Sequence, residues 1–159
     1  MAATGSIREA LESTVFRSLT ALVARLLLGM PFVIFGIMKY ANMGRMTAYI
    51  EKGGLPGGVI YLVIPFQILC GLAVWLGAAT RWAAFLLGGF CLVAASLYHN
   101  NLADPGELAF FTKDFATAGG FYFLWQSGPG RWSIDDWLQR LEEEHGTARR
   151  AGQEATLIA

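Results

Sequence analysis

The sequence predicts an all-α integral membrane protein, a four-helix bundle followed by a short amphipathic C-terminal helix. Of the 159 residues, 55% are hydrophobic and only 15% are charged, whereas soluble domains average about 25% charged residues. The apolar residues also gather into runs of roughly 20, the length that a helix needs to cross a bilayer core of about 30 Å. Because only helices and closed barrels span lipid, these runs favour helices.

The first apolar run, residues 19–38, predicts the first membrane helix. Its single charge is Arg25, and it ends at Lys39 and Tyr40, a basic and an aromatic residue typical of the headgroup region. Arg25 and Lys39 are separated by nearly four helical turns, so both lie on roughly one face. A buried arginine needs a polar partner, so we expect this face to point into the protein.

Residues 1–18 precede this helix as a cytoplasmic or interfacial segment. Ile7, Leu11 and Val15 recur at helical spacing, which is typical of a short helix at a membrane surface. The acidic residues of the segment and the length of the run that follows are unlike a secretory signal.

Three further apolar runs complete the predicted domain of residues 19–126. They cover residues 58–78, 82–98 and 109–125. The turn at Thr80-Arg81-Trp82 is short, so the second and third helices must be antiparallel neighbours. The fourth run is the least apolar, because Lys113 and Asp114 lie in its first turns.

Loops and turns are expected between and after these runs. Residues 39–56 form a loop that ends in a glycine- and proline-rich turn, and Asp104 to Glu107 form another turn. Residues 127–131 break the chain, and Ser133 is a suitable N-cap for an amphipathic helix over residues 134–145. The apolar face of that helix carries Ile134, Trp137, Leu138 and Leu141. Its acidic face should stay solvated or dock on protein, and the polar residues 146–159 should be disordered.

Four crossings place both termini on one side of a multi-pass protein of the cell membrane. The side of the termini carries Arg8, Arg17, Arg81, Arg131 and Arg140 near the spans, and the other side carries Lys39, Arg45, Lys52 and Lys113. This small excess of basic residues favours cytoplasmic termini. The net charge is zero, so nothing favours a nucleic-acid partner.

Six polar residues are candidates for binding a ligand. Lys39, Gln67, His99, Lys113 and Asp114 are expected to line one vestibule that narrows toward the middle of the membrane, and Arg25 lies deeper, toward the opposite surface. Each also has a structural interpretation. The lysines can be interfacial anchors, Gln67 can join two helices, and Asp114 can begin a helix. His99 can be a solvated loop residue, and Arg25 can pair with a backbone carbonyl or a headgroup.

No familiar catalytic or metal motif accompanies these residues. The sequence has no GxSxG, HExxH, phosphate-binding or dinucleotide fingerprint. His99 and His145 are far apart, and a zinc site lacks ligands. Cys70 and Cys91 lie in apolar runs and are interpreted as buried small side chains. We therefore single out no catalytic residue, and we expect no metal and no covalently bound cofactor.

Several short motifs, in order, resemble the DoxX family of small bacterial membrane proteins. They are Arg25-x-x-x-Gly29, Gly36-x-x-Lys39, Gly54-x-Pro56, Gly71, Leu76-Gly77-x-x-Thr80-Arg81, His99, Phe111-x-Lys113, Gly119-Gly120, Gly128-Pro129-Gly130-Arg131 and Ser133-x-Asp135. The resemblance covers roughly residues 22–135 and implies a four-helix membrane bundle. It departs from the family at Gln67, where members often carry a glutamate, and at Asp114, where an asparagine often follows the lysine.

The resemblance implies a link to quinone-dependent sulfur oxidation, as a subunit of thiosulfate:quinone oxidoreductase, or to redox-stress complexes. The first hypothesis is therefore a redox-linked subunit whose polar pocket holds a quinone or small hydrophobic ligand. Without a redox centre of its own, such a subunit takes electrons from a soluble or membrane partner. The alternative is a non-catalytic scaffold or assembly factor in the lipid bilayer, and a homo-oligomer is compatible with either.

Overall fold

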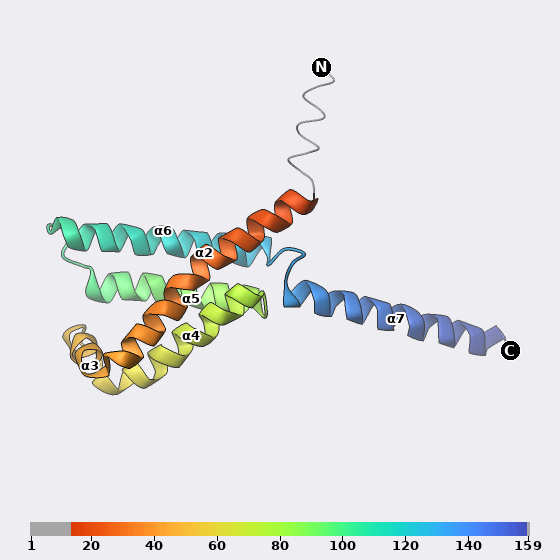
Figure 1. Ribbon diagram of the computed structural model, residues 1–159, viewed down its shortest axis with the longest axis horizontal. Helices are drawn as coiled ribbons and strands as arrows, with labels where there is room; N and C mark the ends of the chain where they lie inside the picture. The colour runs from red at the N-terminus through yellow and green to blue at the C-terminus, as the bar shows by residue number, and fades with distance from the viewer. Residues whose placement is uncertain (1–13, 159) are drawn as a thin grey trace, which may run out of the picture.

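The computed structural model describes residues 14–158, and nearly all of them are helical (Figure 1). In the last helix, side chains are described up to Thr147 and again at Arg149 and Gln153. The helices are α2 (Thr14–Ala41), α3 (Met43–Lys52), α4 (Ile60–Leu76), α5 (Thr80–Tyr98), α6 (Pro105–Ser127) and α7 (Ile134–Ile158), with a short 3-10 turn η1 (Gly57–Val59) before α4. This part of the chain contains no strand, so the all-α prediction is confirmed.

Three helical segments of the described chain are long and apolar enough to cross a membrane. They are Val15–Ala41, Gly57–Leu76 and Thr80–Tyr98. The expected spans at residues 19–38, 58–78 and 82–98 fall on these segments. The protein is therefore a multi-pass membrane protein in a lipid bilayer. The fourth long helix, α6, does not belong to this set because of its charged first turns.

The long helices pack in pairs, α2 along α4 and α5 along α6, and α4 and α5 join the pairs. Their shared core contains Phe32, Val74, Leu87, Ala118 and Phe121, and the rings of Phe32 and Phe121 meet edge to face at 5.2 Å. Glycines allow the close approach of α2 and α4. A Cβ at Gly29 would lie 2.9 Å from the carbonyl oxygen of Gly71, so this contact requires a residue without a side chain.

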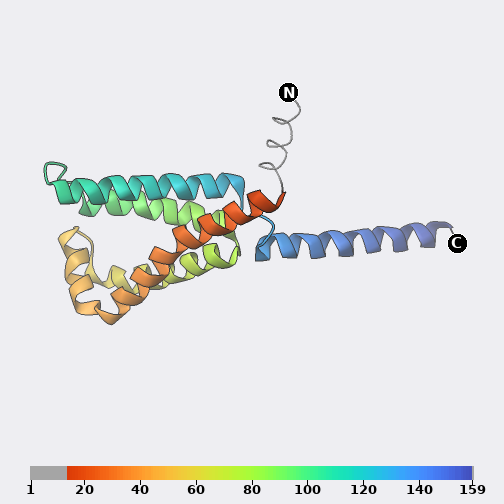
Figure 2. The ribbon, with the colours of Figure 1, turned by 45° about the horizontal axis from the view of Figure 1, so that its top comes forward.

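Helix α3 lies inside the segment that the sequence analysis treated as a loop, residues 39–56. Its apolar residues Met43, Met46 and Ile50 follow helical spacing and pack beside Ile60 and Ile64 of α4. These contacts explain the helix, because a ten-residue segment is marginal on its own and is stabilised by packing its apolar face. In both views α3 lies at the end of the bundle near the α5–α6 connection (Figures 1 and 2).

Helix α6 begins four residues earlier than expected, so the predicted turn at residues 104–107 is its first turn. Asp104 caps the helix, and its carboxylate accepts hydrogen bonds from the backbone N–H groups of Gly106 at 2.8 Å and Glu107 at 3.0 Å. Pro105 follows in the first helical position, where its missing N–H costs nothing. The α6 start is therefore set by capping rather than by hydropathy.

Helix α7 corrects the prediction for the C-terminus. The expected helix over residues 134–145 continues to Ile158, through most of the segment expected to be disordered. Residues 146–158 include three alanines and two arginines, which are strong helix formers. The helix projects away from the bundle (Figure 1). At the other terminus, residues 1–13 of the expected interfacial segment, including Ile7 and Leu11, lie outside the described residues, and residues 14–18 belong to α2.

Candidate functional site

Lys39 and Gln67 meet inside the bundle. The Lys39 ammonium donates a 2.7 Å hydrogen bond from Nζ to Oε1 of Gln67, and Gln67 is only 4% exposed. Nζ also lies 5.8 Å from the centre of the Phe90 ring on α5, within the range of a cation–π contact. Thus α2, α4 and α5 all contribute to this contact, and Lys39 points into the bundle as predicted.

Asp114 on α6 brings a negative charge to the same region. Its carboxylate acts electrostatically on Lys39, and its side chain is 15% exposed. Lys113 is 57% exposed, and its Nζ lies 3.2 Å from Oδ1 of Asp114 and over the ring of Phe110. We call Lys39, Gln67 and Asp114 the polar cluster, and Lys113 lies at its outer edge.

His99 contacts Glu107, which the sequence analysis placed in a turn and did not consider as a site residue. His99 follows the last residue of α5, and its Nδ1 lies 2.8 Å from Oε2 of Glu107. Its ring stacks on Phe110 at 5.1 Å. Glu107 and Asp114 are two helical turns apart and therefore share one face of α6. This spacing could have identified Glu107 from the sequence as a neighbour of the site, but only if α6 had been known to begin at Pro105.

Two tyrosines lie beside these residues and were also missed. The rings of Tyr49 on α3 and Tyr98 on α5 stack at 4.7 Å, and the Tyr98 hydroxyl donates a 3.4 Å hydrogen bond to the Ile50 carbonyl. Burial, followed by the charge of Glu107, raises the pKa of the Tyr49 phenol. Tyr49 was missed because α3 was expected to be a loop.

Arg25 lies at the opposite end of the bundle, apart from the other candidates. It is 1% exposed, and Nη2 donates to the carbonyl oxygen of Trp132, while Nε and Nη1 have no partner among the described residues. The Asp135 carboxylate acts on it electrostatically. This geometry matches the structural interpretation of Arg25, a pairing with a backbone carbonyl.

Asp135 secures the start of α7 beside Arg25. Its two carboxylate oxygens accept hydrogen bonds from the backbone N–H groups of Ala79 at 2.7 Å and Thr80 at 2.9 Å, where α5 begins. Its own N–H donates to the Gly77 carbonyl at 2.8 Å. Arg25 and Asp135 therefore hold the start of α7, which we call the C-terminal arm, against the α4–α5 turn. Their role in these contacts is structural.

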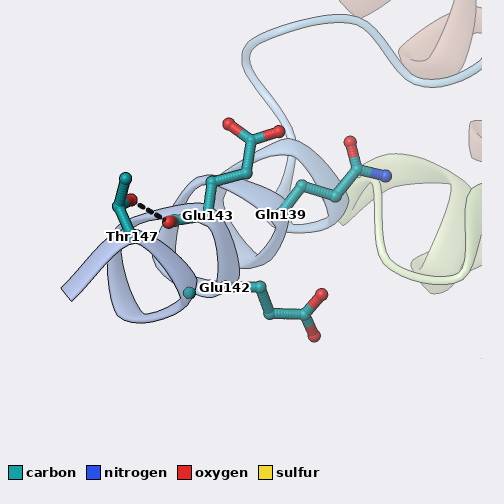
Figure 3. A pocket seen from close by; sticks show the side chains of 5 residues that line it. Gln139, Glu142, Glu143 and Thr147 are labelled. Atoms are coloured by element: carbon teal, nitrogen blue, oxygen red, sulfur yellow. Dashed lines mark hydrogen bonds between the residues drawn. The ribbon is translucent and has the colours of Figure 1, made fainter. Parts of the chain in front are cut away.

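Two surface hollows contain no residue of the polar cluster. One, of about 390 Å³, is apolar and is formed by α2, α3 and α4; its lining residues are Tyr40, Met43, Tyr61, Ile64, Pro65, Ile68 and Leu69. The other is lined by α7 alone, and Figure 3 shows Gln139, Glu142, Glu143 and Thr147 on that single helix. A hollow on one helix has no opposing wall, so it does not make a binding site.

The described residues include no group of three or more His, Cys, Asp or Glu side chains that could hold a metal ion. Cys91 is buried and Cys70 is partly buried, and both are free thiols. The chemistry available at the polar cluster is therefore that of an ammonium, an amide and a carboxylate beside aromatic rings.

Comparison with known proteins shows that the chain is similar to bacterial membrane proteins. A family model described as DoxX matches residues 20–100. The inner membrane protein YqjF of Escherichia coli is 37% identical over 119 residues, which cover 75% of this chain and 92% of that protein. An uncharacterised membrane protein of Mycobacterium tuberculosis is 31% identical over 129 residues, covering 73% and 79%. The inner membrane protein YphA of Escherichia coli is 27% identical over 126 residues, covering 75% and 90%. No solved structure matches the chain.

Proposed function

Because this chain belongs to the DoxX family of membrane proteins, we propose that it is a redox-linked subunit that binds a quinone or a similar small hydrophobic ligand at the polar cluster. The observation that carries the proposal is the inward-facing ammonium of Lys39, held by Gln67 within a bundle of apolar helices. Charged side chains are costly inside a membrane and usually mark a functional site.

The polar cluster fits the carbonyl head of a quinone. An ammonium has three N–H donors, and Gln67 takes one of those on Lys39, so donors are left for a ligand oxygen. The Asp114 carboxylate is near enough to act electrostatically on Lys39, and Phe90 offers an aromatic wall. When bound, a quinone supplies two-electron chemistry coupled to protons. The residues of this chain bind and orient the head group, and electrons come from a soluble or membrane partner.

The experiment is a thermal-shift measurement on the purified protein in detergent with decylubiquinone as the probe. We expect the quinone to raise the melting temperature, because a ligand that binds only the folded state stabilises it. Lys39→Met should abolish this shift, and Asp114→Asn should reduce it. The matched control is Lys52→Met, on the exposed surface of α3, which should keep the full shift. A quinone effect that is absent from the unmodified protein, or equal in Lys39→Met, would refute the proposal.

A scaffold or assembly factor is the second candidate, and α7 is the observation that favours it. This helix exposes Ile134, Trp137 and Leu138, at 37%, 59% and 46%, on an arm that leaves the bundle. A stoichiometric partner that survives Lys39→Ala and Lys113→Ala, and is lost when residues 137–159 are removed, would support this function. A second copy of the chain is one partner that the same pull-down would reveal.

We further propose that α6 is a fourth membrane segment and that the termini are cytoplasmic. Ala118, Phe121 and Leu124 of α6 are buried in the core shared with the three spans. The five tryptophans also lie near one end of the bundle, at Trp75, Trp82, Trp125, Trp132 and Trp137. Tryptophan is enriched at membrane interfaces, so the end of α6 at Trp125 is level with the end of α4 at Trp75.

A further inference from the structure

The polar cluster is closed on the side of Arg25. Along α2, Arg25, Phe32 and Lys39 follow one another at intervals of two helical turns, and Phe32 is 8% exposed. Phe121 and Leu87 pack in the same core and are both 0% exposed. This apolar layer separates the polar cluster from Arg25, so water and polar solutes have no path through the bundle from that end.

The opposite end is covered by the tyrosine pair. The side chain of Asp114 is 15% exposed, and Tyr49 is 39% exposed. The carboxylates of Glu107 and Asp114 both act electrostatically on the Tyr49 phenol. Tyr98 is the last residue of α5, beside His99, which contacts Glu107, and Asp114 lies two helical turns further along α6 than Glu107. The stacked pair of Tyr49 and Tyr98 therefore lies nearer this end of the bundle than Asp114 does. Figures 1 and 2 show α3, which carries Tyr49, at this end of the bundle.

The contact that holds this cover in place is small. Helix α3 is anchored on α4 through its buried face, but it reaches α5 through the stacked rings of Tyr49 and Tyr98 and one long hydrogen bond from Tyr98 to Ile50. Gly53, just after α3, lies against the Tyr98 ring, and a Cβ there would lie 2.6 Å from Cζ of Tyr98. One stacked pair is a weak restraint, so the rings can part without unfolding α3.

We propose that the stacked rings of Tyr49 and Tyr98 form a gate that controls access from the aqueous surface to Asp114 and the polar cluster. The inference gives the proposed site its route of access and rests on that site as the place where a ligand binds. Access from water also allows protons to reach Lys39 and Asp114 from this surface. The test uses cysteine labelling and needs no ligand, so its outcome is separate from that of the quinone experiment.

The test measures the rate at which a charged, membrane-impermeant maleimide modifies Asp114→Cys in a background with Cys70→Ala and Cys91→Ala. The matched reporter is Lys113→Cys, one residue away and 57% exposed, which lies outside the gate. Gly53→Ala displaces the Tyr98 ring, and Tyr49→Ala removes the stack. Gly44→Ala is the control, because a Cβ at Gly44 meets nothing within 4 Å.

We expect Gly53→Ala and Tyr49→Ala to accelerate labelling of Asp114→Cys by roughly two- to tenfold, the effect of losing one aromatic stack. Tyr49→Phe keeps the stack and should leave the rate unchanged, as should Gly44→Ala. Labelling of Lys113→Cys should not change in any variant. Equal rates at Asp114→Cys with and without the stack would overturn the proposal. A parallel acceleration at Lys113→Cys would also overturn it, since it would show a general loosening of α6.

Discussion

The ammonium of Lys39 donates a 2.7 Å hydrogen bond to the side-chain oxygen of Gln67, and this bond joins α2 to α4 within the bundle. Each residue lies in a helix that is otherwise largely apolar, and Gln67 is 4% exposed. A buried polar group that loses its partner costs more than the bond itself contributes. The two residues therefore depend on each other, and each explains why the other is tolerated in a membrane helix.

This dependence predicts a non-additive effect in a double-mutant cycle of Lys39→Met and Gln67→Leu. Each single change leaves one polar partner unpaired, so the double variant should be more stable than the sum of the single losses predicts. We expect a coupling of about 1 kcal/mol, the scale of side-chain hydrogen bonds between membrane helices. Unfolding of the detergent-solubilised protein by SDS measures it. Lys52→Met combined with Gln67→Leu is the control and should be additive; an additive cycle at Lys39 would contradict the pairing.

The start of α7 gives a second prediction, with neighbouring aspartates as a matched pair. Asp135 accepts two backbone hydrogen bonds from the α4–α5 turn and the start of α5, whereas Asp136 pairs with Arg140 on the surface of α7. Asp135→Ala should lower the free energy of unfolding by about 1–3 kcal/mol, because two N–H groups lose their acceptor. Asp136→Ala should cost only about 0.5 kcal/mol. Thermal melts compare the variants, and similar losses for both would show that Asp135 does not hold the arm.

The three long spans could be predicted from the sequence because continuous apolar runs reflect a single constraint, the thickness of the bilayer. Elements governed by local packing were harder. In the sequence, the segment that forms α3 is as short and polar as a loop. Its helical structure is explained only by the packing of Met43, Met46 and Ile50 against α4. The first turn of α6 depends on the Asp104 cap, which the sequence analysis interpreted as part of a turn.

The same distinction, between what helix positions predict and what packing determines, applies to the candidate site. The sequence indicated that Lys39 and Gln67 line one vestibule, since both positions can be counted along helices from the same membrane surface. It did not indicate what Arg25 binds, because the acceptor is Trp132, 107 residues further along the chain. Nor did it indicate the Tyr49–Tyr98 stack, which depends on how α3 sits on the bundle. Contacts of this kind depend on tertiary packing rather than on periodicity.

Gly77 provides a third prediction. Its φ is +70°, and a Cβ there would collide with Nη1 of Arg25 and lie 2.5 Å from Cβ of Ser133. Gly77→Ala should therefore destabilise the fold by at least about 2 kcal/mol, since the left-handed backbone alone costs roughly 1–2 kcal/mol. Gly119→Ala, where a Cβ meets nothing within 4 Å, should be neutral or slightly stabilising. Melting temperatures that respond alike to both changes would rule out this close packing.

The membrane topology gives the last prediction. Helix α6 has 23 residues, or about 35 Å at the helical rise, enough to cross a bilayer. If it does, Asn101→Cys before α6 and Arg131→Cys after it lie on opposite sides, and Arg45→Cys on α3 shares the side of Asn101→Cys. Each single-cysteine variant is made in the background with Cys70→Ala and Cys91→Ala. In intact spheroplasts, an impermeant maleimide should label Asn101→Cys and Arg45→Cys, and it should label Arg131→Cys only after lysis. Labelling of Asn101→Cys and Arg131→Cys under the same condition would place α6 on one side of the membrane. The reverse pattern, with Arg131→Cys labelled first, would keep four crossings and invert the orientation, because the excess of basic residues that favours cytoplasmic termini is small.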